Sequence, residues 1–321
     1  MKPGNEAADH LATAAPTWDL ERIVAELRAA RHHWRESQQR NLETGGRELP
    51  SRDVVRNVVT ALAGALFPMR LGPPDLRQET EDFYVGHTLD TALSGLLQQV
   101  RLELRHAARG GAPAPAEIEL KAVDIVRRFA AALPGIRGAL DSDVLAAYRG
   151  DPAAHSVDEV LLCYPGIFAV THYRLANVLW KLGVPLLARL VTELAHTETG
   201  IDIHPGAQIG GGFFIDHGTG VVIGETTIIG ERVRIYQAVT LGAKSFPVSE
   251  DGGLHKGLPR HPIVEDEVVI YAGATILGRI TIGRGSTIGG NVWVTRSVAP
   301  GSHVTQATSR QESAGGGAGE I

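Results

Sequence analysis

The chain has 321 residues with a formal net charge of −5, 43% hydrophobic residues and 21% charged residues, which is the composition of a soluble globular protein. Its length allows two domains with cores of their own, and the lack of a basic stripe argues against a nucleic-acid partner. The single cysteine, Cys163, excludes an internal disulfide and favours a reducing compartment.

The N-terminal segment, residues 1–17, is rich in Ala, Pro and Thr, and we expect it to be disordered. It has no apolar stretch of the kind found in secretory signals. No apolar run in the chain approaches the roughly 20 residues that cross a bilayer. We therefore expect a cytoplasmic protein without a membrane-spanning segment.

Residues 18–200 are expected to form an α-helical domain, because they are rich in good helix formers and because apolar residues recur there at helical spacing. Ser51 is expected to cap the second helix. A break is expected at 110–115, and Pro134-Gly135 is expected to end the fourth helix. The expected helices are Leu20–Trp34, Val54–Leu66, Leu89–Leu104, Ile118–Ala132, Gly166–Leu182 and Pro185–Glu198.

Each apolar stripe of these helices is interpreted as part of a helix-packing core. Cys163 and Met69 are assigned to the same core. His32 and His33 are expected to lie on a solvated helix face and not at a metal.

The second part of the chain changes its period and its composition. Only 14 of the 38 glycines precede residue 200. After it an aliphatic residue recurs every six positions, often followed by glycine, and this pattern is typical of a parallel β-helix in which about three hexads close one triangular coil. The expected inward anchors are Ile203, Ile209, Ile215, Val221, Ile229, Ile235, Leu241, Val264, Ile270, Ile276, Ile282, Ile288 and Val294.

Two interruptions break the hexad series, which we assign to residues 201–300. The first is an octad after Val221, beside His217. The second, 242–263, is far too long for a hexad and must leave the β-helix as a loop, and long loops in compact domains are functional or disordered. A flexible tail is expected over 301–321. The fold class is thus α+β, with an α-helical domain followed by a parallel β-helix.

The candidate chemistry lies beside the anchors. Asp202 and Asp216 flank anchors and can face outward, and Asp202 lies 15 residues before His217, slightly less than one coil. A carboxylate that orients an imidazole leaves its other nitrogen free to act as a base on a hydroxyl. The alternative is that both aspartates cap turns and that His217 is a surface histidine.

The long loop ends at Arg260-His261, which could reach the same region, and arginine suits bidentate recognition of a carboxylate. The alternative is that both side chains face solvent. The chain has no serine nucleophile elbow, no Walker motif and no dinucleotide fingerprint. Acyl transfer, if it occurs, should therefore be direct, with an acceptor hydroxyl as the attacking group.

Residues 151–298, which contain these candidate groups, resemble bacterial serine O-acetyltransferase, a member of the hexapeptide-repeat acyltransferase superfamily. The aspartate–histidine segments are more specific for this family than the hexads are. The matching segments are DPAA at 151–154, TGIDIHPG at 199–206, IDHGTG at 215–220, VIGET at 222–226, VTLG at 239–242 and RHP at 260–262.

The resemblance implies a left-handed β-helix and transfer of acetyl from acetyl-CoA to the L-serine hydroxyl, the first step of cysteine biosynthesis. It implies that His217 is the general base, that Asp202 orients it and that His261 assists. It further implies that Asp151 and Asp216 hold the serine ammonium and that Arg260 holds its carboxylate. Acetyl-CoA would bind near Gly242, Ala243, Ala272 and Gly273, and no metal is expected.

The resemblance also implies a homotrimer with acetyl-CoA between two β-helices, and often a dimer of trimers through the helical domain. The C-terminal Ile321 would enter O-acetylserine sulfhydrylase, because a free carboxylate with an apolar last side chain suits such capture; the alternative is a functionless tail. Two departures stand out. The 242–263 loop is longer than in well-known members, and further hexads are missing after Val298.

Two other readings remain open besides another hexapeptide O-acetyltransferase. One is a metal-dependent protein of the carbonic-anhydrase kind that uses His204, His217 and His261, since zinc binds three histidines and water; the histidine spacing argues against it. The other is a regulatory scaffold for a sulfhydrylase.

Overall fold

The computed structural model describes residues 18–37, 49–108, 114–245 and 257–306. By internal contacts the chain divides into two units, Met1–Arg47 and Glu48–Ile321. The expected disordered start, residues 246–256 of the long loop and residues 307–321 of the expected tail lie outside the described residues. None of the described helices is long and apolar enough to cross a membrane.

The first unit contributes one described helix, α1 (Leu20–Ser37), where the sequence predicts it. The assignment of its stripe to a core is wrong, because α1 buries none of its residues. Leu20, Leu27 and Trp34 are 63%, 53% and 50% exposed. Helical periodicity predicts which side chains share a face, but it does not specify what covers that face.

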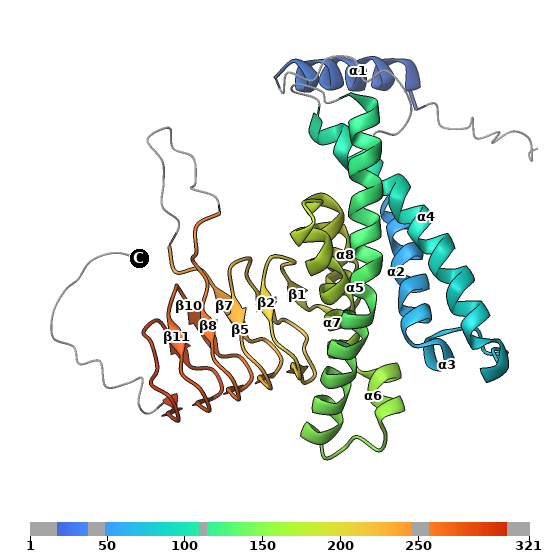
Figure 1. Ribbon diagram of the computed structural model, residues 1–321. Helices are drawn as coiled ribbons and strands as arrows, with labels where there is room; N and C mark the ends of the chain where they lie inside the picture. Colours follow the sequence, from blue (N-terminus) through green and yellow to red (C-terminus); the bar gives the residue numbers. More distant parts are fainter. Residues whose placement is uncertain (1–17, 38–48, 109–113, 246–256, 307–321) are drawn as a thin grey trace, which may run out of the picture. The chain divides into compact units, whose positions relative to one another are not determined.

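The second unit begins with a group of packed helices (Figure 1). Helix α2 packs on α4, α4 packs on α5, and α5 and α8 both pack on α7. Ser51 precedes α2 as expected, but its side chain makes no cap bond; its backbone N–H donates to Gln99 Oε1 at 2.7 Å instead. The helices are α2 (Arg52–Leu66), α3 (Pro68–Leu71), η1 (Gln78–Thr80), α4 (Glu81–Ala107), α5 (Pro115–Gly150), α6 (Val157–Cys163), α7 (Pro165–Lys181) and α8 (Pro185–Thr199).

The expected helix end at Pro134 is wrong, because Pro134 lies inside α5, which has 36 residues in all. Proline removes one backbone hydrogen bond and usually ends or kinks a helix. Here the buried stripe continues on both sides of it, with Phe129, Leu133, Ile136 and Leu140 between 0% and 6% exposed. Packing of this stripe outweighs the lost bond, and α5 thereby delivers Gly150-Asp151 to the β-helix.

Two residues assigned to the helical core are not in it. Cys163 is exposed and Met69 is 41% exposed. Cys163 is the last residue of α6, and Met69 lies in α3. The sequence predicted neither of these short helices. Short helices of four to seven residues show too few repeats for periodicity to identify a buried face.

The hexads form a parallel β-helix of three sheets (Figure 1). The first sheet has the order β1-β4-β7-β10-β13, the second β2-β5-β8-β11 and the third β3-β6-β9-β12-β14. The strands are β1 (Asp202–Ile203), β2 (Gln208–Ile209), β3 (Phe214–Ile215), β4 (Val222–Ile223), β5 (Ile228–Ile229), β6 (Arg234–Ile235), β7 (Thr240–Gly242), β8 (Ile263–Val264), β9 (Val269–Ile270), β10 (Thr275–Leu277), β11 (Thr281–Ile282), β12 (Thr287–Ile288), β13 (Trp293–Val294) and β14 (His303–Val304).

The anchors stack inward from coil to coil, but one expected register is wrong. Ile203 pairs with Ile223, not with Val221, and Ile223 pairs with Leu241. The two extra residues therefore lie between Ile215 and Ile223. Both Val221 and Ile223 are buried, so the apolar pattern alone cannot distinguish them. The insertion thus lies in the Asp216–Gly220 turn itself and not after it.

The ladder also continues past residue 300. Strand β14 pairs with β12 through His303 and Val304, although the sequence placed this segment in the tail. This last turn packs tightly on the coil below. A Cβ added to Gly283 would lie 2.4 Å from the Pro300 nitrogen. A shortened spacing after Val294 hides the final strand from a strict six-residue pattern.

The triangular coil has three corners, two of which carry the candidate site residues. We call the corner between the first and second sheets, residues 204–207, 224–227, 243–245 and 257–262, the loop corner. We call the corner between the third and first sheets, residues 216–221, 236–239 and 271–274, the His217 corner. Because a side of the coil spans several residues at about 3.3 Å each, the two corners are separated by on the order of 10–15 Å.

Candidate active site

The His217 corner presents an imidazole to solvent on a strained turn. His217 has a φ of +59°, and Gly218 and Gly220 follow with +89° and +81°. A Cβ on Gly218 would lie 2.4 Å from Ile201 Cδ1, so only glycine lets this turn close on the first coil. Histidine is uncommon at positive φ, and the result is a side chain that is 72% exposed. The described residues of the single chain therefore leave most of this imidazole open to water.

Asp216, beside it, is the buried member of the pair. Its Oδ1 lies 3.8 Å from His217 Nδ1, and its Oδ2 accepts a 2.8 Å hydrogen bond from Arg234 Nη2. The carboxylate is only 9% exposed, so this ion pair is worth more than a surface pair would be. Asp216 is thus positioned by the strand of the next coil.

Asp151 joins this group from the end of α5. Its Oδ2 accepts a 2.5 Å hydrogen bond from the Tyr164 hydroxyl, and its Oδ1 accepts one from the Ala153 N–H at 2.8 Å. The Tyr164 hydroxyl, followed by the Ala153 N–H, lowers the pKa of Asp151, whereas the pKa of Tyr164 rises to about 12, chiefly through the same bond. Asp151 is therefore an anion next to Asp216 and His217.

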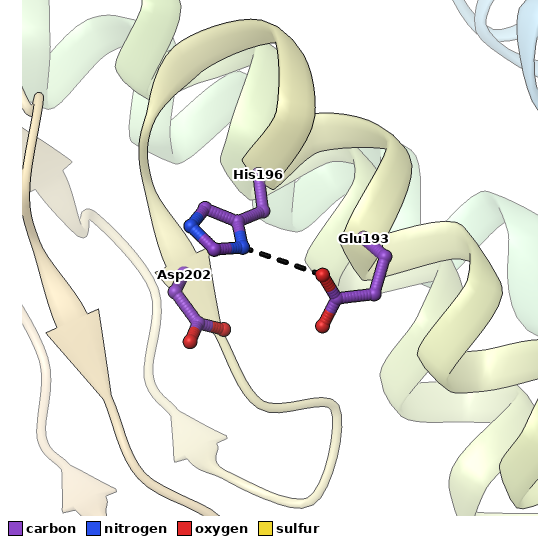
Figure 2. Close-up of side chains that lie close together, drawn as sticks. All are labelled: Glu193, His196 and Asp202. Atoms are coloured by element: carbon purple, nitrogen blue, oxygen red, sulfur yellow. Dashed lines mark hydrogen bonds and ion pairs between the residues drawn. The ribbon is translucent and has the colours of Figure 1, made fainter.

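Asp202 lies on the same corner but is not joined to His217. Gly220 N–H donates to Gly200 O and Asp202 N–H donates to Val221 O, so β1 starts against the His217 turn. Figure 2 shows the Asp202 carboxylate beside Glu193 and His196 of α8. Among the described residues no hydrogen bond or ion pair links Asp202 to His217. The expected orienting contact is therefore absent from the single chain, and Asp216 is the carboxylate nearest the imidazole.

Glu193, His196 and Asp202 are the described residues with metal-ligand spacing, since their ligand atoms lie within 4.8 Å of one another. Two carboxylates and one imidazole could hold a divalent cation. However, His196 Nδ1 already lies 3.3 Å from Glu193 Oε2, and Arg189 pairs with the other Glu193 oxygen. Ordinary ion pairing accounts for the cluster.

The loop corner holds Arg260 and His261. Arg260 Nη2 pairs with Glu225 at 2.7 Å. Thr226 N–H donates to His261 Nδ1 at 3.1 Å, so Nε2 carries the proton in the neutral ring and is a donor. The backbone carbonyl of His261 accepts from Arg279 at 3.0 Å. The loop thus returns to the β-helix in a fixed conformation, with one cation and one neutral imidazole donor.

We expect the loop corner to make folding sensitive to acid. Burial lowers the pKa of His204 and of His261 to about 4, and Arg189 and Arg260, respectively, act in the same direction. The ordinary value, about 6.5, applies in the unfolded chain. Because the folded-state value is the lower one, stability is fully present above pH 6.5 and is lost as pH falls toward 4.

Thermal unfolding between pH 7 and pH 4.5 measures this dependence. His261→Asn should make the unfolding temperature fall less steeply with pH, whereas His303→Asn, a change of an exposed histidine, should leave the slope as it is. Equal slopes in all three proteins would contradict the assignment.

Gly224 makes room for the His261 ring. A Cβ there would lie 2.0 Å from His261 Cδ2 and 2.1 Å from Nε2. We expect Gly224→Ala to displace the imidazole and the adjacent Arg260, and displacements near 1 Å lower turnover roughly 10–100-fold. Gly138→Ala is the matched control, because nothing lies within 4 Å of its added methyl. Steady-state turnover of both variants tests this, and equal activity would show that His261 does not act on substrate.

The residues expected at one site therefore lie on two corners of the chain. Asp151, Asp216 and His217 meet at the His217 corner, where Ala272 and Gly273 also lie. Arg260 and His261 lie at the loop corner with Gly242 and Ala243. The expectation that Arg260-His261 reaches His217 is wrong within one chain, because a side of the coil lies between them.

Two residues of the His217 corner were missed from the sequence. Tyr164 and Arg234 hold Asp151 and Asp216. Arg234 had a usable signal, since it lies 18 residues after Asp216, one coil further, and directly precedes anchor Ile235. Tyr164 had none, because only the turn between α6 and α7 brings it back to Asp151.

Known proteins are similar to this chain over most of its length. Residues 261–296 match the family model "Bacterial transferase hexapeptide (six repeats)". The chain is 55% identical over 311 residues to "Serine acetyltransferase, plasmid" of Synechococcus elongatus, covering 94% of this chain and 95% of that protein. It is 49% identical over 162 residues to the serine acetyltransferase of Mycobacterium tuberculosis, covering 50% of this chain and 67% of that one.

A solved structure is similar as well. The crystal structure of Entamoeba histolytica serine acetyltransferase 1 in complex with L-cysteine superposes with a TM-score of 0.66 at 35% identity, covering 88% of this chain and 99% of that chain.

Proposed function

This chain belongs to the serine acetyltransferase family, and we propose that its two corners form an active site that transfers acetyl from acetyl-CoA to the hydroxyl of L-serine. The products are O-acetyl-L-serine and CoA. The helical region followed by a left-handed parallel β-helix is the fold of this family. The observation that carries the proposal is the exposed His217 imidazole, whose Nδ1 lies 3.8 Å from the Asp216 carboxylate.

We assign the chemical roles from that arrangement. His217 takes the proton of the serine hydroxyl as its oxygen attacks the thioester carbon; the tetrahedral intermediate then expels CoA thiolate, which recovers a proton from the imidazolium. Asp151 and Asp216 hold the ammonium, and Arg260 holds the carboxylate bidentately. His261 is neutral and donates from Nε2 near the same carboxylate. Asp202 starts β1 against the His217 turn, and its proposed role of orienting the imidazole requires its carboxylate to turn away from Glu193 and His196.

The placement of these groups supports a homotrimer. A single serine needs the aspartates of the His217 corner and the arginine of the loop corner at once, but one chain holds them on separate corners. Three β-helices packed side by side bring the loop corner of one chain against the His217 corner of the next. Acetyl-CoA would lie along that groove, with Ala272 and Gly273 of one chain facing Gly242 and Ala243 of its neighbour.

Mixing two inactive variants tests the shared site. We expect co-refolded His217→Ala and Arg260→Ala chains to regain activity, since an interface with His217 from one chain and Arg260 from the other is intact. Random mixing makes about a quarter of the interfaces intact in a closed ring. The separate proteins mixed without refolding serve as the control. Failure to recover activity, with mixed trimers shown by mass, would contradict the shared site.

A second level of assembly is also proposed. The exposed stripe of α1 supports association of two trimers through their helical region, because large contiguous apolar faces are usually covered. Light scattering of the full chain and of a chain lacking residues 1–47 distinguishes a hexamer from a trimer. The same mass in both would contradict a role for α1.

A thiol-release assay tests the function itself. With acetyl-CoA fixed, we expect CoA release with L-serine, less with L-homoserine and none with L-alanine, which has no hydroxyl. The activity should survive a chelator, in contrast to a zinc enzyme that uses His204, His217 and His261. No release with any hydroxy amino acid would overturn the proposal and favour the regulatory scaffold.

We also propose that Ile321 binds O-acetylserine sulfhydrylase. The tail lies outside the described residues, so its carboxylate and apolar side chain are the support. Removing the last few residues should abolish co-elution with the sulfhydrylase and leave acetyl transfer intact. Co-elution of the truncated chain would contradict this role.

A further inference from the structure

One guanidinium connects the backbone beside Asp151 to the Asp216 carboxylate of the proposed ammonium subsite. Arg234 Nη1 donates to the carbonyl of Gly150 at 2.6 Å, and Gly150 immediately precedes Asp151. Its Nη2 donates to Asp216 Oδ2 at 2.8 Å. A single side chain from β6 therefore connects the end of α5, which carries Asp151, to the turn that carries Asp216 and His217.

Aromatic rings hold this guanidinium in place. Arg234 lies over the Phe214 ring at 5.0 Å and over the Tyr236 ring at 4.7 Å, and Tyr236 stacks on Tyr271 at 5.0 Å. Such contacts fix the plane of arginine as well as its position. A Cβ at Gly150 would lie 3.0 Å from the Phe214 ring, so the helix end approaches this stack as closely as its backbone allows.

Tyr164 supports the other carboxylate in the same way. With Tyr164 on one oxygen and the Ala153 N–H on the other, both oxygens of Asp151 are already fixed. Tyr164 lies in the turn between α6 and α7, whereas Ala153 follows the end of α5. Asp151 is therefore held by two separate segments of the chain. A carboxylate fixed before binding loses less conformational freedom when an ammonium arrives.

The charges in this group have a consequence for specificity. Two carboxylates and one guanidinium leave a net charge of −1 on Asp151, Asp216 and Arg234 together. Arg234 supplies the opposite charge that the nearly buried Asp216 carboxylate needs, and the net charge that remains matches one ammonium.

We infer that Arg234 and Tyr164 are positioning residues that set the geometry and the charge of the ammonium subsite, and so select an amino acid over the same hydroxy acid without its amine. The inference rests on the proposed function. Neither side chain is assigned a contact with the acetyl group. Their loss should therefore affect serine recognition more than acetyl-CoA recognition.

Kinetics of the full-length chain test this with L-serine and with 3-hydroxypropanoate, which lacks the ammonium. We expect Tyr164→Phe to raise the KM for serine roughly 3–10-fold, and Arg234→Met to lower kcat/KM for serine roughly 10–100-fold. The KM for acetyl-CoA should stay within about twofold, and preference for serine over 3-hydroxypropanoate should shrink in both. Arg234→Lys should restore part of the loss by returning the charge without the bidentate fork.

Matched controls separate positioning from folding. Tyr148→Phe and Arg284→Met change exposed residues away from both corners and should behave as the unaltered chain. Unchanged serine KM and unchanged preference in Tyr164→Phe and in a folded Arg234→Met would overturn the inference alone. An equal rise of both KM values would also overturn it, since that indicates a general structural effect. An unaltered chain that transfers nothing to serine overturns the proposed function and the inference with it.

Discussion

Replacing His217 by alanine is expected to lower kcat roughly 10²–10⁴-fold, the range that general-base assistance contributes. The imidazole is 72% exposed and pairs at 3.8 Å with Asp216, so it contributes no buried packing that its removal would disturb. The turn itself is retained because Gly218 and Gly220 adopt its positive φ angles. The loss should therefore appear in turnover and not in assembly.

The measurement is steady-state thiol release, with oligomer mass and unfolding temperature recorded on the same samples. His303→Ala, which alters another exposed histidine, is the matched control and should retain full turnover. His217→Asn keeps a polar side chain at a position with positive φ, where asparagine is tolerated, and should be as inactive as the alanine variant. Turnover within threefold of the unaltered chain in either variant would refute a histidine base.

The repeat domain was predictable because its pattern and its structure have the same cause. Each inward anchor must be aliphatic to stack on the anchor one coil away, and Ile235, Leu241, Ile270 and Ile276 are all 0% exposed. The register failed where two apolar residues compete, Val221 and Ile223, because either can be buried, and the predicted series ended before β14, where the spacing after Val294 shortens. The insertion between Ile215 and Ile223 is therefore visible in strand pairing and not in composition.

The helical region was predicted less completely, for a different reason. Helix positions follow from local periodicity, but helix ends and buried faces depend on partners distant in the sequence. Pro134 lies inside α5 because Leu133 and Ile136 are buried on both sides of it, and Cys163 is exposed although the same seven-residue helix, α6, buries Val160. Neither the position of Pro134 inside a helix nor the exposure of Cys163 follows from the local sequence pattern.

The predicted site residues lie on two corners of one chain, and their chemical roles stay predictions. Asp151, Asp216 and His217 are brought together by the structure, although Asp151 lies 65 residues before Asp216 in numbering. Arg260 and His261 are not brought to them, since a six-residue repeat places each residue along a coil without saying which neighbour faces it. Family resemblance supplied their proposed roles, and the separation of the two corners is the reason that we propose a site shared between two chains.

A buried ion pair ties the helices to the first coil. Arg174 of α7 donates to both oxygens of Asp143 of α5, at 2.5 Å and 2.7 Å. The Asp143 side chain is 0% exposed and that of Arg174 is 9% exposed. Arg174 also donates to Gly210 O at 2.9 Å, and Asp143 accepts from Phe213 N–H at 2.9 Å. The pair thus satisfies backbone groups of the turn that leads into β3 and the His217 corner.

Arg174→Met is expected to destabilise the chain by about 3–5 kcal/mol, the cost of leaving one member of a buried pair alone. Burial already raises the pKa of Asp143, and Arg174 opposes that effect, so the lone carboxyl must either stay charged in the core or take up a proton. Denaturant unfolding at fixed protein concentration measures the loss, because assembly makes stability depend on concentration.

Arg127→Met, which breaks an exposed pair with Asp124, is the matched control and should change stability by less than about 0.5 kcal/mol. The double change Asp143→Leu with Arg174→Met should recover part of the loss, since apolar side chains can replace a buried pair without leaving a charge. It should not recover all of it, because the Phe213 N–H and the Gly210 carbonyl would still lack their partners. A single Arg174→Met variant within about 1 kcal/mol of the unaltered chain would mean that the helices and the first coil are joined by apolar packing alone.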